Sequence, residues 1–383
     1  MSNPYKTVFI YTMPGDWHAI LAEAALKQRG HRVLRYFGTD FPALADVEFE
    51  YGDGGESLRL HTIDGSYQLS DFDVVWNRRM TAPRLPPGID PRDRDYVSLQ
   101  LRFGDAAMRS LLREAFWINP YDAARNADHK PKQLQLALRN GLKIPETLIS
   151  NRPEAIRRFI DAHPSVIHKP LIGAAWEEDD KTLSTYTARV RAEDLPGEAL
   201  LRAAPGIFQA QVPKQFEVRA QFFGASYFAL KIDSTRIEYG EMDWRLHQNG
   251  AMTDGSVALP DAVYRACMKQ LGSLGLVAGA FDFIVTPDDE WIYLEVNEAG
   301  QFIFVEQWHS EFTLFDALCD FIESVDRAFE YRRKPGAQRL ADLIEAVDPE
   351  RICERDDARR AAPAETLSGQ PVDASAQTQA EAA

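Results

Sequence analysis

Apolar and polar positions near the start of the chain predict strands that alternate with helices. The apolar run at residues 7–11 is typical of a buried strand, Asp16 can cap the helix that follows, and Gly30 suits its end. Residues 31–36 predict a second strand, which completes a β-α-β unit and favours a parallel sheet. The other elements expected in this α/β region are a hairpin over residues 58–69, a strand at 73–76, a helix at 94–114 and a strand at 117–119.

The rest of the chain begins with helices and then turns mainly to strands. One helix is expected at residues 129–140, where Gly141 ends it, and another at 153–162. A strand opens at Pro145, and the other predicted strands cover residues 166–168, 183–187, 207–212, 216–223, 226–232, 279–285 and 291–296. The remaining predicted helices cover residues 261–274 and 311–331. From about residue 360 the sequence has almost nothing to bury, which predicts a disordered tail.

Composition and charge narrow the class of protein. In 383 residues, 58 Asp and Glu outnumber 43 Lys and Arg, so the formal net charge is −15. Such a charge argues against nucleic acid or a membrane surface as a partner, because both are polyanionic. The three cysteines are far apart, no signal-peptide pattern opens the chain, and no apolar run approaches the roughly 18 residues of a membrane span. We therefore expect a location in the reducing cytoplasm.

The most informative stretch is an acidic hairpin at residues 279–300. Side chains alternate between the faces of a strand, so Glu295 and Asn297 are expected to point the same way. A four-residue loop at 287–290 would place Asp282 directly across from Glu295. Two carboxylates among apolar neighbours are costly unless a cation neutralises them, and oxygen ligands suit nucleotide-bound Mg²⁺. The alternative is a sheet edge where these residues face water.

Cationic side chains are spread along separate predicted elements. Lys169 ends a buried strand, where its ammonium could lie over a phosphate or a base edge, or could extend to water. Lys130 opens a helix, where a phosphate could also meet backbone N–H groups. Lys231 and Arg245 follow later in the chain. In an acidic protein, cations on separate strands favour a pocket for a small polyanion.

Further polar candidates lie on other predicted strands. Glu217 and Arg219 share one face of a strand, and Arg78 and Arg79 end a strand of the first domain. The two arginines either line a substrate channel or pair with acids of the helix at 94–114. One strand segment could place its backbone beside an adenine, as could many strands: Gln209, Ala210, Gln211 and Val212. The eight histidines show no metal-ligand spacing, and no Ser-His-Asp or Cys-His signature is visible.

In their order along the chain, these residues resemble the ATP-grasp superfamily. The matching positions lie between residues 120 and 305: Lys130, the segments 133–136 and 141–147, Lys169, Gln209, Glu217, Arg219, Arg245, Asp282, Glu295 and Asn297. A closer resemblance, over roughly residues 5–330, is to the maturases of microviridin-type peptides, the graspetides. The segments that carry it are residues 73–79, 117–120, 169–171 and 295–301.

The resemblance implies an ATP-grasp fold of mixed α/β and α+β class, with ATP and Mg²⁺ as cofactors. The implied domains are an N-terminal pre-ATP-grasp α/β domain at residues 1–120, a central lid subdomain at 121–212, a C-terminal subdomain with the Mg²⁺ site at 213–335, and a helical extension with a disordered tail at 336–383.

The resemblance also implies a role for each candidate residue. Arg219 and Arg245 would stabilise the transferring γ-phosphoryl group or the acceptor carboxylate, and Arg78 and Arg79 would contact the substrate. The ligands implied for Mg²⁺ are Asp282, Glu295 and Asn297. The contacts implied for ATP are Lys130 and Lys169 at the phosphates or the adenine edge, the backbone of Gln209, Ala210, Gln211 and Val212 at the adenine, Glu217 near the ribose, and Lys231.

One departure from the family lies at residues 171–180. Many ATP-grasp proteins place a glycine-rich flap after the second lysine, whereas this segment has one glycine and four acids. The acids would repel phosphates unless they face away. The alternative is that they meet a basic peptide.

The resemblance implies a ligase that activates Asp or Glu side chains of a ribosomal precursor peptide, which carries a leader segment. The acyl phosphate would react with Ser, Thr or Lys side chains of the same peptide, giving ester or amide macrocycles with ADP and phosphate. One alternative is a ligase that joins free amino acids or small metabolites, and another is a nucleotide- or peptide-binding protein without catalysis. Related maturases form homodimers, and the long helix at 311–331 could serve that contact.

Overall fold

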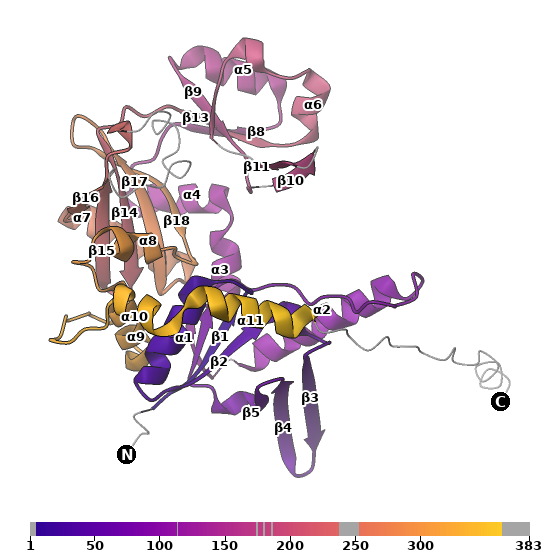
Figure 1. The fold of residues 1–383 in the computed structure, drawn as a ribbon. Coiled ribbons are helices and arrows are strands. Elements are labelled where there is room, and N and C mark those ends of the chain that lie inside the picture. Colours follow the sequence, from indigo (N-terminus) through magenta and orange to yellow (C-terminus); the bar gives the residue numbers. More distant parts are fainter. Residues whose placement is uncertain are drawn as a thin grey trace. The chain divides into compact units, whose positions relative to one another are not determined.

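The computed structural model describes residues 5–112, 114–173, 175–178, 181–184, 187–236 and 253–361 (Figure 1). The chain divides into two compact units. Unit 1 comprises Met1–Phe116 and Ile344–Ala383, and unit 2 comprises Trp117–Leu343. Among the described residues, no helix is both long and apolar enough to cross a membrane.

Unit 1 opens with the β-α-β unit that the sequence predicts. Asp16 caps the first helix by accepting a hydrogen bond from the His18 backbone N–H, at 3.2 Å, and Gly30 follows its end with φ at +91°. The strands form a sheet of order β2-β1-β6-β7, in which β1 is parallel to both of its neighbours. The elements are β1 (Thr7–Thr12), α1 (Trp17–Gln28), β2 (Arg32–Phe37), β6 (Val74–Asn77) and β7 (Phe116–Ile118).

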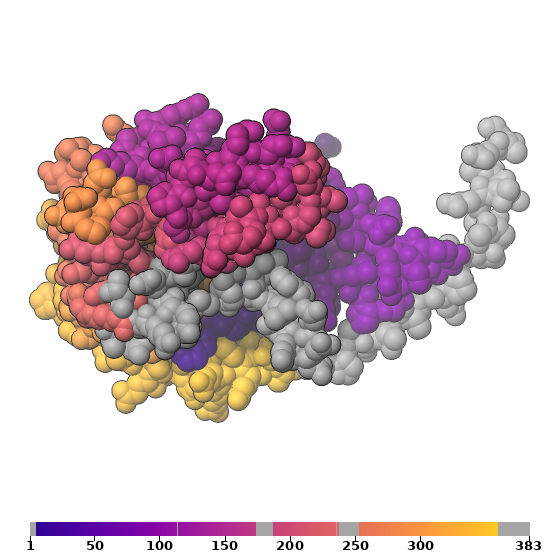
Figure 2. Space-filling view, turned by 90° about the horizontal axis from the view of Figure 1, so that it is seen from above, coloured from indigo at the N-terminus to yellow at the C-terminus, as the bar shows by residue number. Residues whose placement is uncertain are grey.

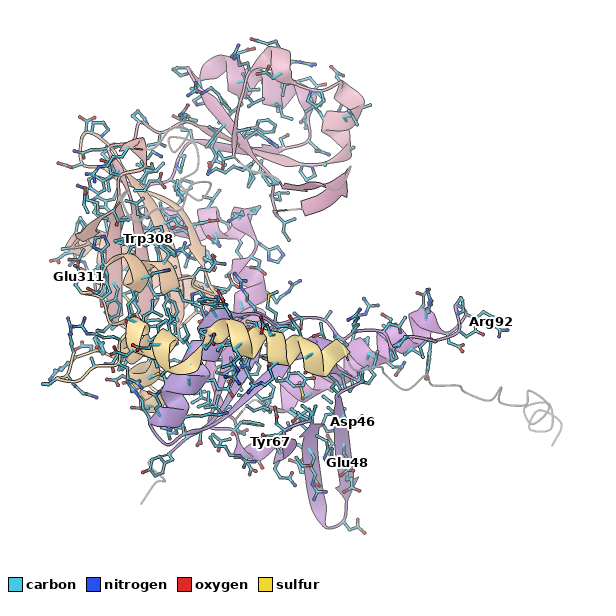
Figure 3. All side chains as sticks on the ribbon, viewed as in Figure 1. Asp46, Glu48, Tyr67, Arg92, Trp308 and Glu311 are labelled. Atoms are coloured by element: carbon cyan, nitrogen blue, oxygen red, sulfur yellow. The ribbon has the colours of Figure 1, made fainter. Side chains whose placement is uncertain are left out.

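A second sheet of unit 1 contains the predicted hairpin. Its three antiparallel strands are β3 (Ala45–Gly52), β4 (Gly55–Thr62) and β5 (Gly65–Gln68). Strand β3 was not predicted from the sequence, and its Asp46 and Glu48 are exposed on one face (Figure 3). The helix α2 (Arg94–Leu111) ends before the predicted residue 114, and only its Asp105 and Met108 are buried.

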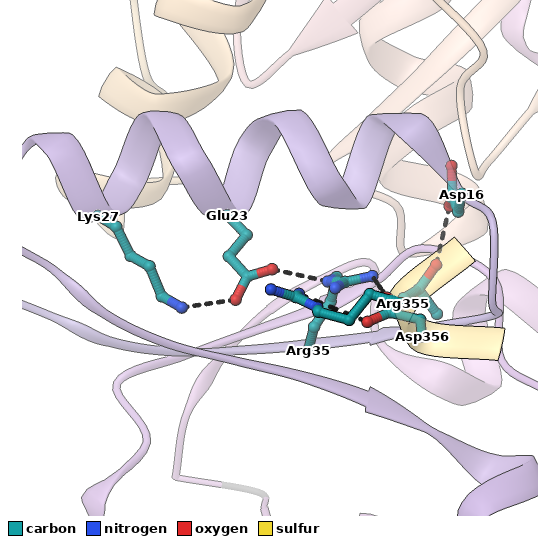
Figure 4. A network of polar contacts seen from close by, with 7 residues as sticks. Asp16, Glu23, Lys27, Arg35, Arg355 and Asp356 are labelled. Atoms are coloured by element: carbon teal, nitrogen blue, oxygen red, sulfur yellow. Dashed lines mark hydrogen bonds and ion pairs between the residues drawn. The ribbon is translucent and has the colours of Figure 1, made fainter. Parts of the chain in front are cut away.

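The C-terminal helix of unit 1 is tied to the first helix by buried charges (Figure 4). The helix α11 (Pro349–Ala361) packs against α1 and follows α10 (Leu340–Val347). Arg35 Nε lies 2.7 Å from a Glu23 oxygen, and Arg35 Nη1 lies 2.7 Å from Asp356 Oδ2. Only 6% of the side chain of Arg35 and 6% of that of Asp356 are exposed, so this ion pair is largely shielded from water.

The first lobe of unit 2 is a small sheet covered by helices. Its four-stranded sheet has the order β12-β9-β13-β8, and α5 and α6 bury Ile156, Ile160 and Leu201 against it. Figure 2 shows this lobe in magenta to rose. The elements are α3 (Tyr121–Ala127), α4 (Lys130–Asn140), β8 (Thr147–Ser150), α5 (Pro153–Ala162), β9 (Val166–Lys169), β12 (Ala188–Val190), α6 (Glu198–Ala203) and β13 (Gly206–Ala210).

A separate hairpin lies between β9 and β12 in the chain. Its strands are β10 (Ala175–Glu178) and β11 (Lys181–Ser184), which pair antiparallel. The sequence predicts one strand at residues 183–187, so β10 was not expected. The side chains of the acidic residues in the segment 171–180 lie outside the described part of the chain.

The second lobe of unit 2 is a five-stranded antiparallel sheet of order β16-β15-β14-β17-β18. One face of the sheet packs on α7 and α4 around an apolar core that contains Phe222, Phe281 and Phe283. The elements are β14 (Phe216–Phe223), β15 (Ser226–Ile232), β16 (Thr253–Ser256), α7 (Asp261–Leu274), β17 (Ala278–Val285), β18 (Trp291–Asn297), α8 (Ile303–Trp308) and α9 (Leu314–Ser324).

The predicted long helix at residues 311–331 is wrong in extent. The helix α9 ends at Ser324, because Val325 adopts a left-handed conformation with φ at +51°. The following segment instead packs on the β14–β15 turn, where Ala225 N–H donates to Phe329 O at 2.9 Å. Since α9 is almost wholly buried, it has no long exposed face for a dimer contact. The predicted disordered tail falls mainly on residues 362–383, outside the described residues.

Candidate active site

The strands of the acidic hairpin pair Asp282 with Glu295 as the sequence predicts, but the loop that joins them differs from the prediction. Asp282 lies directly opposite Glu295 in the β17–β18 pair. The predicted loop at 287–290 is wrong, because Thr286 N–H donates to Glu290 O at 3.0 Å and closes a shorter loop with Asp289 at φ +60°. A β-bulge at Leu294 adds one residue to β18 and restores the pairing of the two carboxylates.

One face of this sheet carries the candidate residues in an ordered grid. Cross-strand partners lie on the same face, so the registers of β14, β17 and β18 define three rows. The rows are Glu217–Ile284–Ile292, Arg219–Asp282–Glu295 and Gln221–Ala280–Asn297. The structure therefore brings together Glu217, Arg219 and the three residues predicted as metal ligands.

Each carboxylate of the middle row lies against a cation. Arg219 Nη1 is 2.7 Å from Asp282 Oδ2, and Lys130, at the start of α4, forms an ion pair with Glu295. Arg219 Nη2 also lies 3.4 Å from Gln301 O. The cations compensate the carboxylates, which would otherwise repel each other on neighbouring strands.

The donor set of this face suits Mg²⁺. Asp282, Glu295 and Asn297 offer two carboxylates and an amide oxygen, and hard cations prefer such ligands. Within the described residues, no group of three or more His, Cys, Asp or Glu could hold a metal ion. A Mg²⁺ ion held here would therefore need further oxygens from phosphate or water.

Two buried polar atoms on this face have no hydrogen-bond partner among the described residues. They are Arg219 Nε and Gln221 Oε1, and the two side chains belong to neighbouring rows of the grid. Buried polar groups in proteins are nearly always paired. Both atoms therefore suit a site that a polar ligand completes.

A pocket beside the grid gathers most of the residues predicted to contact ATP. Lys169, the segment Gln209–Val212 and Glu217 all line it. The pocket combines apolar walls with polar groups, as small-molecule sites do. Its other lining residues are Pro145, Ile167, Lys214, Ile284 and Leu294.

The segment Gln209–Val212, which we call the hinge, leaves a backbone N–H group of the pocket available for a ligand. Gln209, 4% exposed, donates from Nε2 to Thr147 Oγ1 at 3.0 Å, so its side chain serves the protein itself. Ala210 and Gln211 use their N–H groups in bonds of 2.9 Å to Glu146 O and Ser165 O. The Val212 N–H makes no hydrogen bond with any described residue. This N–H is therefore a donor suited to a base edge.

Glu217 is a buried carboxylate at the floor of the pocket. Burial raises its pKa, and the ammonium of Lys214 and the hydroxyl of Ser234, at 3.0 Å, oppose that rise. Lys214 was not among the predicted site residues. Its signal is its position just before β14, three residues ahead of Glu217, which brings its ammonium back over the start of the strand.

The structure does not bring every predicted residue to this site. Lys231 pairs in register with Val218 and so lies on the core-facing side of the sheet, where its ammonium is 3.3 Å from Asp254 and 4.6 Å from the Phe216 ring centre. Arg245 lies outside the described residues.

The two arginines predicted to contact substrate belong to unit 1. Arg78 is 1% exposed, and its Nε lies 3.3 Å from Asp16 in the β1–α1 turn. Arg79 is partly exposed, with Nη1 at 3.9 Å from the sulfur of Met13. Both follow β6, at the carboxyl edge of the parallel sheet, where α/β folds place their ligand-binding groups.

A buried carboxamide that the sequence analysis did not single out supports the same hairpin. Asn119 Oδ1 accepts from the backbone N–H groups of Val277 and Ala278, at 2.7 and 3.0 Å. Its Nδ2 donates to the backbone oxygens of Ala278 and Glu298, at 2.9 and 2.8 Å. Asn119 therefore ties the start of β17 to the loop that follows Asn297.

Known proteins are similar to this chain in sequence and in fold. The family model for the MvdD pre-ATP grasp domain matches residues 7–125. No sequence among the curated proteins matches the chain.

Three solved structures are similar over most of the chain. The Chryseobacterium gregarium RiPP-associated ATP-grasp ligase, in complex with ADP and a leader and core peptide, has 25% identity and a TM-score of 0.77, covering 85% of this chain and 100% of that chain. The macrocyclase MdnC from Microcystis aeruginosa MRC, bound with precursor peptide MdnA, has 28% identity and a TM-score of 0.72, covering 82% and 98%.

The third structure, the ATP-grasp ligase PsnB with a phosphomimetic variant of a minimal precursor, Mg and ADP, shares the fold at 24% identity and a TM-score of 0.63, covering 84% and 98%. The expected ATP-grasp fold with a pre-ATP-grasp domain is thus confirmed. Together the fold and these similarities identify the chain as an ATP-grasp ligase that resembles the graspetide maturases.

Proposed function

We propose that this chain uses ATP and Mg²⁺ to activate Asp or Glu side chains of a ribosomal precursor peptide and to close them into ester or amide macrocycles. The observation that carries the proposal is the Arg219–Asp282–Glu295 row, which lies beside a pocket lined by Lys169 and the hinge at Gln209–Val212. The similar structures from Chryseobacterium gregarium and Microcystis aeruginosa MRC contain such peptides. Since the reaction consumes ATP, we place it in the cytoplasm.

The chemistry requires charge compensation more than a protein nucleophile. The peptide carboxylate attacks the γ-phosphorus of ATP, and ADP leaves as the acyl phosphate forms. A hydroxyl or amine of the peptide then attacks the acyl carbon and loses its proton, and the C–O bond breaks with its electron pair leaving on phosphate. Cations positioned at the developing charge accelerate such a transfer.

We assign the roles from the grid and the pocket. Asp282, Glu295 and Asn297 would hold Mg²⁺, which supplies positive charge at the phosphates. Lys130 and Arg219, released from the carboxylates, would turn to the phosphates or to the acceptor carboxylate.

The remaining roles concern the nucleotide and the domains. Lys169 would contact the phosphates, the hinge N–H of Val212 the adenine, and Glu217 the ribose. We place the lid at residues 121–212 and the catalytic subdomain at 213–335. Lys231 lies on the opposite face of the sheet from Glu217 and Arg219, so we assign it no contact with the nucleotide.

The test is incubation of the purified chain with ATP, MgCl₂ and synthetic precursor peptides rich in Thr, Ser, Asp and Glu. Each bond formed should lower the peptide mass by one water and release one ADP. Asp282→Asn and Glu295→Gln should abolish both signals, whereas Asp288→Asn in the exposed turn of the same hairpin should leave them intact. Unchanged peptide masses across all candidate precursors would contradict the proposal.

Two other functions would give different results in the same assay. A ligase for free amino acids would release ADP with amino-acid pairs and leave peptides unchanged. A binding protein without catalysis would show no turnover, and its affinity for ATP would survive Asp282→Ala and Glu295→Ala.

We further propose that the chain forms a homodimer through α2. Tyr96, Leu99 and Phe103 follow one another along the helix and are 67%, 44% and 67% exposed. Asp95 and Arg102 flank this stripe and are also exposed. In an antiparallel pair of α2 helices related by a two-fold axis, Asp95 of each copy would meet Arg102 of the other. Arg92, just before the helix, marks its free end (Figure 3).

Charge reversal tests this contact by light scattering. Asp95→Arg should shift the chain toward monomer, and the double variant Asp95→Arg with Arg102→Asp should restore the dimer. Leu138→Asp, at an exposed leucine of α4, serves as the control and should leave the dimer unchanged. A monomeric wild type, or a double variant as weak as the single one, would contradict the α2 contact.

A further inference from the structure

The backbone of Val296 lies between the two predicted metal ligands of β18. Val296 is flanked by Glu295 and Asn297, and β18 lies at the edge of the five-stranded sheet. On the outer side of this strand, Gln133 of α4 faces the peptide groups. Its Oε1 accepts from Val296 N–H at 2.9 Å, and its Nε2 donates to Val296 O at 2.9 Å. One carboxamide thus makes both bonds that a neighbouring strand would make.

The same carboxamide is fully occupied. Gln133 Oε1 also accepts from the Tyr293 hydroxyl at 2.7 Å, and Nε2 also donates to Ala127 O at 2.6 Å. These four bonds use every donor and acceptor position of the group. The side chain is 3% exposed, so its orientation is set by these partners and not by water.

The position of Gln133 links it to the predicted metal site. It lies one helical turn after Lys130, whose ammonium pairs with Glu295. Helix α4 therefore contacts β18 twice, at the side chain of one predicted ligand and at the backbone of the next residue.

Strand β18 is irregular just before Glu295. The bulge at Leu294 interrupts the ladder to β17 just before Glu295. Just before the bulge, Tyr293 N–H points outward and donates to Lys143 O at 2.7 Å. A bulge bends and twists its strand, so the direction in which Glu295 and Asn297 leave the strand depends on what holds its outer edge.

We propose that Gln133 is a positioning residue for metal binding, which fixes the strand segment of Glu295 and Asn297 relative to Lys130. This inference rests on the proposed function, since it assumes that these residues hold Mg²⁺. Outer groups that orient metal ligands typically contribute a factor of about 10 to 100 to metal affinity.

The test is calorimetric titration of the full chain with ADP, in the presence of EDTA and in the presence of MgCl₂. In the wild type, MgCl₂ should tighten ADP binding. In Gln133→Ala, the tightening should fall by about tenfold or more, while the affinity for ADP in EDTA should remain within about twofold. Gln135→Ala, at an exposed glutamine of the same helix, should behave as the wild type.

A second variant separates positioning from general destabilisation. Gln133→Glu keeps the shape, but an ionised carboxylate would face the backbone oxygens of Val296 and Ala127 without a proton to donate. A neutral carboxyl can donate to one of them, and burial favours the neutral form. The deficit of Gln133→Glu relative to the wild type at the same pH should therefore shrink between pH 8 and pH 6. Gln135→Glu should show no such recovery.

The outcomes distinguish the two proposals. If MgCl₂ does not tighten ADP binding by the wild type, the proposed metal site is wrong and this inference falls with it. If both Gln133 variants retain the wild-type tightening, the positioning role alone is wrong. An affinity for ADP that falls equally in EDTA and in MgCl₂, with no pH-dependent recovery of Gln133→Glu, would also overturn it, because that pattern indicates only a loss of structure.

Discussion

The cations at the site should compete with metal for the carboxylates, and Lys130→Met tests this competition. In the structure Lys130 pairs with Glu295, and the side chains of the two residues are 33% and 21% exposed. If Glu295 is a metal ligand as proposed, a metal ion that arrives without nucleotide would have to displace this ammonium. Removing the ammonium should therefore strengthen the binding of the metal alone, even though the residue is a predicted contact of ATP.

The exposure of the pair sets the size of the effect. A fully exposed pair contributes about 0.2–1 kcal/mol, and a pair at an effective dielectric constant near 20 interacts by about 4 kcal/mol at 4 Å. The Lys130–Glu295 pair lies between these limits, so we expect about 1.5 kcal/mol, or roughly a tenfold gain in affinity for the metal alone. The affinity for Mg²⁺ and ADP together should fall, because an ammonium near phosphate oxygens is lost.

The assay is titration with Mn²⁺ followed by electron paramagnetic resonance, with Mg²⁺ as competitor, at constant ionic strength. Lys132→Met, at an exposed lysine of the same helix, controls for the change in net charge and should alter neither affinity. Opposite signs for metal alone and for metal with ADP would support the reasoning. A Lys130→Met variant that loses affinity in both titrations would refute it, because the ammonium would then not be a competitor of the metal.

Three further predictions concern stability. Asp356→Asn removes a charge from the buried Arg35 pair, so hydrogen exchange in α11 should accelerate about 30-fold, corresponding to about 2 kcal/mol; unchanged exchange would contradict the role of this pair. Asn119→Ala removes four hydrogen bonds and should lower the free energy of unfolding by about 3–4 kcal/mol, measured by urea denaturation. Burial, with the charge of Arg78, lowers the pKa of His18 from 6.5 to about 4, so the unfolded chain takes up a proton first as pH falls. Relative to His18→Gln, the wild type should lose up to about 3 kcal/mol between pH 6.5 and 4, as urea titrations at each pH would show.

The pairing of Asp282 with Glu295 could be predicted from sequence because each side chain of a strand can lie on only one of two faces. The error in the predicted loop and the unforeseen bulge at Leu294 each shift the register by one residue, and they cancel. The predicted pairing is therefore correct partly because these two one-residue errors compensate each other. A bulge leaves no simple sequence pattern, since it depends on how both edges of the strand are held.

The position of Lys231 could also have been derived. The turn at Gly224 and Ala225 places Phe223 opposite Ser226, and counting along β14 and β15 then sets Lys231 opposite Val218. Because Glu217 and Arg219 lie on the other face, this count separates Lys231 from them. The sequence prediction grouped the cations by their order in the chain and not by register.

The buried carboxamides could not be predicted in the same way. Gln133 and Val296 are 163 residues apart, and Asn119 and Glu298 are 179 apart. No local pattern reports a hydrogen bond between such distant segments, because each partner is an ordinary residue of its own element. These contacts follow from tertiary packing, which decides which helix lies along the edge of β18.

The carboxylates of the candidate site are each paired with a cation, which would couple the binding of metal to the binding of nucleotide. Asp282, Glu295 and Glu217 are each matched by a cation, namely Arg219, Lys130 and Lys214. In a chain of net charge −15, such matched pairs offer a nucleotide little attraction until a divalent ion takes the carboxylates. With the proposed ligands, metal binding would release cations for the phosphates, and phosphate binding would remove cations from the metal ligands. Since such coupling is reciprocal, Mg²⁺ and nucleotide should strengthen each other's binding by the same factor.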